Sequence, residues 1–160
     1  MSVNFSDTTP AAPAGSTNVK HQTDGSGNVS AYVPTSVVEL TANNYNATAQ
    51  VANIAATNLV AIPVTGRYKV SAYIIVTTAA TTSSTMPSIT VTWSDADSGQ
   101  AQTLTLTATS TGNTLTTFAQ ASALLSVNAA APLAFSTSGY ASVGATAMQY
   151  AIHIVVEQVM

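Results

Sequence analysis

The run GRYKVSAYIIVTT, residues Gly66 to Thr78, is the longest run of the chain with the alternation of a single β-strand. Successive side chains of a strand point to opposite faces. The face that we expect toward the core is mostly apolar: Tyr68, Val70, Ala72, Ile74 and Val76. The opposite face begins polar but then carries Tyr73 and Ile75, which a solvated face has little reason to place together. We expect this second face to contact another surface.

The closing segment repeats this pattern. Its apolar face consists of Met148, Tyr150, Ile152, Ile154 and Val156, whereas its other face is mixed: Ala147, Gln149, Ala151, His153, Val155 and Glu157. Two such strands are typical of a sheet covered on both sides, once by its sandwich partner and once by a neighbouring subunit. The residues that we place at the subunit interface are Tyr73, Ile75, Ala151, His153 and Val155.

Composition excludes several classes of partner. Charged residues make up 6% of the 160 residues, against roughly 25% in an ordinary domain. Lys20, Arg67 and Lys69 are the only basic residues besides two histidines, and the net charge is -3, so we expect neither nucleic-acid nor membrane binding. The chain has no cysteine, which excludes disulfides and thiolate metal sites. The N-terminus lacks the features of a signal peptide, so we expect synthesis in the cytoplasm.

The first 34 residues differ from the rest of the chain. They contain three prolines and three glycines without sustained periodicity, and Asp24 to Asn28 predict a turn followed by a short strand. We interpret residues 1–34 as an extended anchoring arm, with a disordered tail as the alternative. The apolar residues expected to anchor the arm are Phe5, Val19, Tyr32 and Val33.

Residues 35–160 read as β-structure throughout. Besides the two strands above, the expected strands are 37–40, 50–62, 89–93, 104–108, 118–127 and 133–137, with loops at 79–84, 110–113 and 138–144. About eight strands at short spacing predict an all-β fold, a jelly-roll β-sandwich preceded by the arm.

Two stretches of this domain resemble a known family. The run LVAIPVTGRY, residues 59–68, and the pair ALLSVNAA and PLAF, residues 123–130 and 132–135, are similar to the trimeric jelly rolls of the tumour necrosis factor and complement type. The resemblance implies that the long strand and the final strand are neighbours in a sheet that packs around a threefold axis. It would explain why both strands carry a second apolar face.

The arm carries a second resemblance. NFSDTTPAAPAGSTNVK, residues 4–20, followed by QTD and NVSAYVP, residues 22–24 and 28–34, resembles the leader of structural proteins of tailed phages and prophages. His21 departs from that leader, where an aromatic residue such as tryptophan is commoner. The resemblance implies a virion component with an attachment arm, and it implies no chemistry.

Candidate catalytic and metal-binding residues are scarce. His21 and His153 are the only histidines, and no Ser/His/Asp constellation can be assembled around either of them. Asp95 and Asp97 resemble the start of a calcium loop, but Gln100 to Gln102 lack the further oxygen ligands, so a solvated hairpin turn is the better interpretation. Asn46 begins a glycosylation acceptor, which matters only in a secreted eukaryotic protein. We expect no enzyme, no cofactor and no metal.

The leading hypothesis is therefore a structural virion protein: a homotrimeric capsid decoration or head-fibre protein attached to other virion proteins by its arm. The alternative is a tail-associated head domain that binds a receptor or glycan. The sequence leaves head or tail location open.

Overall fold

The structure, a computed structural model, describes residues 20–23, 29–32, 38–39, 44–129 and 131–159. The chain divides into two compact units, residues 1–36 and 37–160. In the first unit, β1 (Lys20–Thr23) and β2 (Val29–Tyr32) pair antiparallel, so the short strand predicted after the turn has a partner. The turn itself and the anchoring residues Phe5, Val19 and Val33 lie outside the described residues. Tyr32 ends β2, but its side chain is outside the description.

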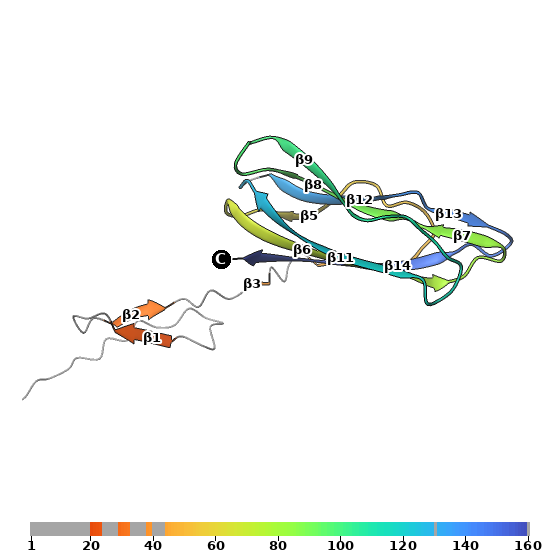
Figure 1. Cartoon of the computed structure of the whole chain (residues 1–160), viewed down its shortest axis with the longest axis horizontal. Coiled ribbons are helices and arrows are strands. Elements are labelled where there is room, and N and C mark those ends of the chain that lie inside the picture. Colours follow the sequence, from red (N-terminus) through yellow and green to blue (C-terminus); the bar gives the residue numbers. More distant parts are fainter. Residues whose placement is uncertain (1–19, 24–28, 33–37, 40–43, 130, 160) are drawn as a thin grey trace, which may run out of the picture. The chain divides into compact units, whose positions relative to one another are not determined.

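The second unit is a β-sandwich of two antiparallel sheets (Figure 1). The sheet that we call the front sheet has the order β11-β6-β14-β3, with β4 also paired to β14. Its strands are β3 (Val38–Glu39), β4 (Tyr45–Gln50), β6 (Gly66–Thr78), β11 (Phe118–Val127) and β14 (Gln149–Val159). The back sheet has the order β5-β12-β8-β9. Its strands are β5 (Thr57–Ala61), β8 (Ser88–Ser94), β9 (Ala101–Thr107) and β12 (Pro132–Ser138).

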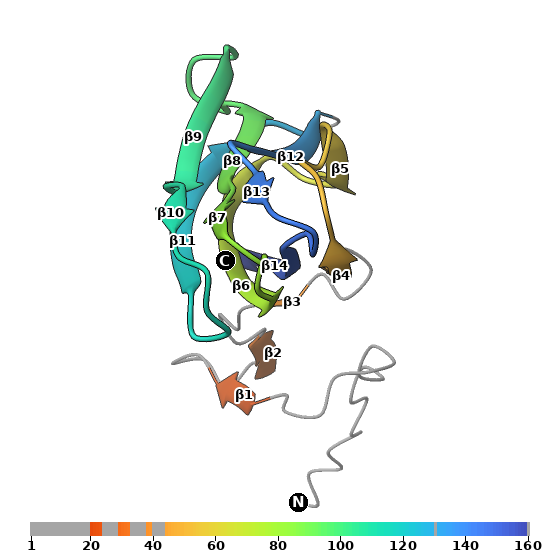
Figure 2. The same ribbon diagram turned by 90° about the vertical axis from the view of Figure 1, so that its right-hand side faces the viewer.

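A third, small sheet closes one end of the sandwich with the order β10-β7-β13. It consists of β7 (Ser83–Met86), β10 (Ser110–Thr111) and β13 (Ala141–Val143). The end-on view separates the two main layers, with β9 and β11 along one side of the sandwich and β4 and β5 along the other (Figure 2). The fold is thus the all-β jelly-roll sandwich that the sequence predicts. The described residues contain no helix, and so none that could cross a membrane.

The two strands that opened the sequence argument are neighbours, as the first resemblance implies. β6 and β14 pair along almost their whole length, and the residues predicted to face the core from both strands are buried. Phe135 and Leu133 of β12 and Ile89 and Val91 of β8 meet them from the back sheet. The alternation of apolar residues in both strands therefore sets the phase of the core correctly.

Two buried tyrosines fasten loops to this core. The Tyr150 hydroxyl donates a hydrogen bond to the Ala52 carbonyl at 2.7 Å, and the Tyr68 hydroxyl donates to the Val64 carbonyl at 2.7 Å. Burial raises the pKa of both phenols, the hydrogen bond to Val64 partly offsetting this for Tyr68. Each tyrosine thus supplies both apolar area and a partner for a loop carbonyl.

Several predicted boundaries are wrong. The strand expected over residues 50–62 is interrupted: β4 ends at Gln50 and β5 begins only at Thr57. The loops expected at 79–84, 110–113 and 138–144 contain β7, β10 and β13 or parts of them. These short strands form because partners distant in sequence pair with them. In the loop before β7, the Ala80 N–H donates a hydrogen bond to Asn113 Oδ1 at 2.7 Å, and Asn113 Nδ2 donates one to the Ala80 carbonyl at 2.6 Å. Local propensity does not encode such partners.

Candidate functional site on the front face

The face of the front sheet that points away from the core, here called the front face, is the candidate functional site. Because β6 pairs with β11 on one side and β14 on the other, its side chains lie in rows across three strands. The rows are Phe118–Ile75–Ala151, Gln120–Tyr73–His153, Ser122–Ser71–Val155 and Leu124–Lys69–Glu157. The third row contains two serines. It lies between rows with larger side chains: aromatic and other large residues in the first two rows, and long residues in the last.

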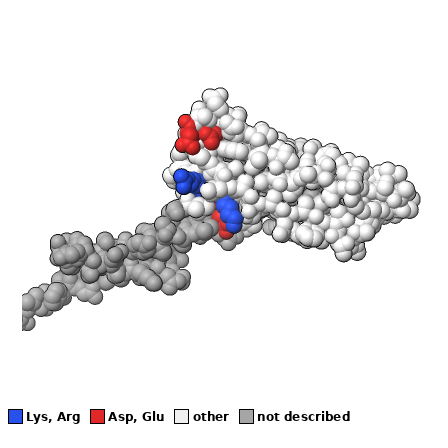
Figure 3. Space-filling model, viewed as in Figure 1, with Lys and Arg blue, Asp and Glu red and all other residues white. Residues whose placement is uncertain are grey.

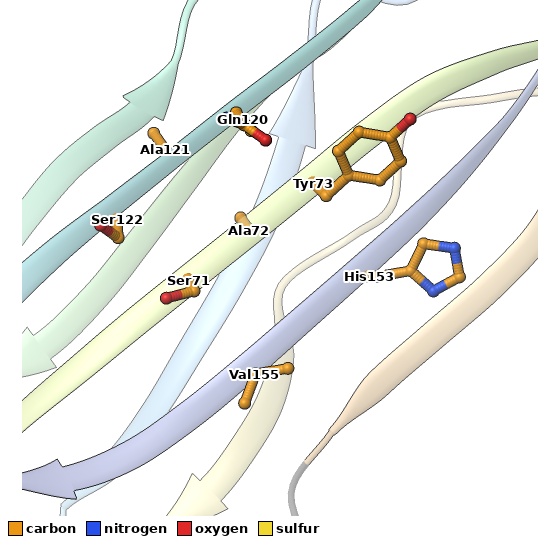
Figure 4. Close-up of a pocket in the computed structure, with 8 residues that line it drawn as sticks. All are labelled: Ser71, Ala72, Tyr73, Gln120, Ala121, Ser122, His153 and Val155. Atoms are coloured by element: carbon orange, nitrogen blue, oxygen red, sulfur yellow. The ribbon is translucent and has the colours of Figure 1, made fainter. Parts of the chain in front are cut away.

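Because small side chains lie between larger ones, the front face has a depression. A depression of about 410 Å³ opens over the small residues, lined by Ser71, Ala72, Tyr73, Gln120, Ala121, Ser122, His153 and Val155. Figure 4 shows the Tyr73 and His153 rings beside one another, with the side chain of Ser71 on the same strand as Tyr73 and those of Gln120 and Ser122 on β11. The depression therefore combines aromatic rings with hydroxyl and amide groups.

The aromatic side chains of the face contact one another. The Tyr73 ring lies 6.0 Å from the Phe118 ring and 6.3 Å from the His153 ring, with an angle of 23° between the latter two planes. On the other side of His153, Nδ1 lies 2.8 Å from Oδ1 of Asn46 on β4, so Nδ1–H donates to that amide oxygen. Three strands thus fix the position of the imidazole.

Large apolar side chains remain uncovered on this face. Phe118 is 55% exposed and Leu124 is 60% exposed, and both lie on the paired edge strand β11 rather than in a loop. Tyr73, Ile75 and Val155 are half-buried. Each of the four rows of this face thus leaves at least one apolar or aromatic side chain at least partly exposed to solvent.

Charge is confined to one end of the domain. Besides Glu39, whose side chain the structure does not describe, the charged residues in the described part of this unit are Arg67, Lys69, Asp95, Asp97 and Glu157. All of them gather toward the end at which β14 terminates, and the other end is uncharged in this view (Figure 3). On the front face Lys69 and Glu157 form an ion pair at 3.5 Å, so the depression has no unpaired charge beside it.

The structure brings the five predicted interface residues together. Tyr73, Ile75, Ala151, His153 and Val155 lie in three adjacent rows of one face. Ala151 differs from the others because it is only 4% exposed within the domain itself. A bulge in β4 between Ala47 and Gln50 lies opposite Ala151, and a residue this buried offers little surface to a partner.

The β11 half of the face was not predicted. Phe118, Gln120, Ser122 and Leu124 alternate with core-facing alanines and Leu125, and this alternation is visible in the sequence. What the sequence does not state is that β11 pairs with β6 in the register that sets Gln120 beside Tyr73. Asn46, noticed only as a glycosylation acceptor, is the hydrogen-bond partner of His153.

No metal-binding cluster is found in the part of the chain that the structure describes. No three histidine or carboxylate side chains there lie close enough to hold a metal ion. Asp95 caps its own turn: Oδ1 accepts hydrogen bonds from the Ser98 N–H and hydroxyl and from the Asp97 N–H, and the bonds from Ser98 are the main reason that its pKa is lowered. The solvated hairpin turn that the sequence predicts accounts for these aspartates.

Comparisons with known proteins give a likeness of fold. No family model and no curated protein matches the chain. A Clostridium thermocellum xylanase 10B structure, CBM22-1 and GH10 modules with xylohexaose, is 12% identical over 76% of this chain, which spans only 26% of that longer chain (TM-score 0.39). The CBM22-1 xylan-binding domain of Paenibacillus barcinonensis Xyn10C is 12% identical over 89% of this chain and 81% of its own (TM-score 0.38).

A third solved structure is similar to this chain at a comparably low identity and TM-score. The N-terminal cellulose-binding domain of Cellulomonas fimi β-1,4-glucanase C is 16% identical over 66% of this chain and 67% of its own (TM-score 0.34). At these identities and TM-scores the likeness assigns neither a ligand nor a function to this chain.

Proposed function

We propose that this protein is a non-enzymatic assembly module whose copies associate as a homotrimer through the front face, and that it serves as a structural component of a phage particle. The main support for a trimer is the apolar character of the front face. Two large apolar side chains on β11, Phe118 and Leu124, are exposed, and three more, Tyr73, Ile75 and Val155, are half-buried. Covering these side chains removes apolar area from water, which favours association by about 25 cal/mol per Å².

Sheet order supports the same proposal. The resemblance to trimeric jelly rolls implies that the long strand and the final strand are neighbours, and β6 and β14 do pair, with β11 and β4 on either side of them. A closed ring of three copies covers one such face on each copy without leaving a further face free to extend the assembly. The single Lys69–Glu157 ion pair on the face is internally compensated, so it does not oppose the approach of another copy.

A single introduced cysteine tests whether the front face is covered, because the natural chain contains none. Gln120→Cys places a thiol in the centre of the front face, and Thr92→Cys places one on the exposed surface of the back sheet. We expect the thiol at 120 to react with a water-soluble maleimide at least about tenfold more slowly than the thiol at 92 when the full chain is assembled. Equal labelling rates would contradict a covered front face.

The virion role rests on the arm. Residues 1–34 resemble phage leaders, and the few apolar residues among them are too few to offset the entropy of ordering so long a segment without a partner. We propose that the arm attaches the assembly to a capsid or other virion protein. Deleting residues 1–34 should leave a trimer that no longer sediments with particles lacking this protein. Undiminished attachment would move the anchoring contact to the jelly roll.

Glycan binding is the second candidate function, favoured by the depression on the same face. A half-buried aromatic ring, Tyr73, beside the Gln120 amide and the Ser71 and Ser122 hydroxyls offers a stacking surface and hydrogen-bonding groups without charge. This use requires the face to be open in the mature protein. Retardation in gels that contain a neutral polysaccharide, lost in Tyr73→Ala but kept in Thr92→Ala, would support glycan binding, and unchanged mobility in all gels would count against it.

A further inference from the structure

His153 occupies a position on the front face where a positive charge has no compensation. Its neighbours come from three strands: Tyr73 of β6 stacks on the ring, Asn46 of β4 accepts from Nδ1, and Val155 lies in the next row on β14 itself. Beyond Tyr73 on the same row, β11 contributes Gln120. Apart from the phenol of Tyr73, none of these side chains can ionise.

The ionised groups of this face lie farther along the strands, and Arg67 is six residues from Tyr73 on β6. Lys69 and Glu157 are each four residues from the Tyr73–His153 row and are paired with one another. Four residues of strand span about 13 Å, which exceeds the Debye length of about 8 Å at physiological ionic strength. Glu39 lies opposite Glu157 in the pairing of β3 with β14, no closer to His153. Asp95 and Asp97 lie on the turn between β8 and β9, where Asp95 bridges to Val127 opposite Gly66 of β6.

The hydrogen bond to Asn46 fits the neutral imidazole. With Nδ1–H donating to the amide oxygen, the other ring nitrogen, Nε2, carries no proton until the ring becomes charged. A neutral ring can be covered by another copy at little cost, whereas an imidazolium ion covered there would lose its hydration without gaining a carboxylate.

We infer that self-association through the front face is acid-sensitive and that His153 is the sensor, an inference that rests on the proposed function. Histidine is the side chain whose charge ordinarily changes between pH 5 and 8. An imidazolium covered by another copy lacks the hydration that it keeps in a free copy, and this difference draws the equilibrium toward free copies on acidification. The assembly is stable at neutral pH and is lost on acidification.

The test is the dissociation constant of the full-length assembly, measured by sedimentation equilibrium at pH 7.5 and pH 5.0 at one ionic strength. For the natural chain we expect the constant to rise at least about tenfold at pH 5.0, since proton uptake at three sites is coupled to dissociation. His153→Gln, which keeps a donor for Asn46 but cannot be charged, should lose most of this rise. His21→Gln removes the other histidine and should still show the rise of the dissociation constant at pH 5.0.

The outcomes separate the inference from the proposed function. A natural chain that stays assembled equally at both pH values overturns the acid sensitivity, and a rise that survives in His153→Gln overturns the role of His153. If His153→Gln does not assemble at pH 7.5, His153→Phe keeps a ring against Tyr73 without a titratable group and takes its place. A natural chain that is a single copy at both pH values contradicts the proposed self-association itself.

Discussion

Replacing Tyr73 by aspartate should dissociate the trimer while leaving each copy folded. Tyr73 lies on the front face, with its ring against Phe118 and His153 and its neighbours Ala72 and Ile74 buried on the opposite side. In a free copy the new carboxylate reaches water, so we expect a loss of unfolding free energy of at most about 1 kcal/mol. In the proposed trimer the same carboxylate would be covered without a partner.

The expected loss of association is large. An unpaired covered charge costs about 3 kcal/mol per copy, so three copies lose about 9 kcal/mol, which corresponds to roughly a millionfold weaker association at about 1.4 kcal/mol per factor of ten. Analytical ultracentrifugation at micromolar concentration should find the Tyr73→Asp variant as single copies with a thermal midpoint close to the natural one.

Thr92→Asp makes the matched change on the exposed surface of the back sheet and should keep the natural mass. Two results would refute the reasoning. Tyr73→Asp that keeps the natural mass would mean that the front face is not the contact, and Tyr73→Asp that fails to fold would mean that this side chain belongs to the core.

Three further predictions concern the stability of the domain. Tyr150→Phe should lower the unfolding free energy in urea by about 1 to 3 kcal/mol, because the Ala52 carbonyl loses the hydroxyl that donates to it at 2.7 Å; no loss would mean that water replaces it. Burial raises the pKa of Tyr68 and Tyr150 in the folded domain, so their contribution to stability is fully present below about pH 10, the usual pKa of a free tyrosine, and is lost as the pH rises through the folded-state pKa. The urea midpoint should therefore fall between pH 8 and 11, and it should fall less steeply in Tyr150→Phe. A midpoint that does not change with pH would contradict this prediction. Gly144→Ala should lower the unfolding free energy by about 1 to 3 kcal/mol, since Gly144 has φ 118° and an added Cβ would lie 2.6 Å from Cβ of Thr81. Gly99→Ala is the control and should lower the unfolding free energy by less, because Gly99 has φ 70° and no atom lies within 4 Å of the added Cβ.

The alternation of apolar residues was sufficient to predict the long strands and their core faces. In β6 and β14 every second residue is buried across most of the strand, so the face that carries Tyr73 and His153 could be named from spacing alone. Ala151 shows the limit of this reasoning: it has the right phase for the front face, but it is only 4% exposed and lies opposite a bulge on β4 that its own segment does not predict. Phase is a local property, whereas cover depends on strands distant in sequence.

The other half of the candidate site depended on register. Residues 118–127 alternate as clearly as residues 66–78, yet nothing in either segment states that Gln120 lies beside Tyr73 rather than beside Ser71. The short strands β7, β10 and β13 were missed for a related reason, because segments of two to four residues take their conformation from partners such as Thr85, which pairs with Thr111 on one side and Ala141 on the other. Local sequence carries little of that information.

The solution mass of the full chain tests the central claim most directly. At neutral pH and micromolar concentration, light scattering should return about three times the chain mass of 16.2 kDa, and dilution should convert this species to single copies without unfolding them. A mass of one chain at every concentration up to the solubility limit would contradict a front face that binds further copies, and the depression between Tyr73 and Val155 would then be open to a ligand.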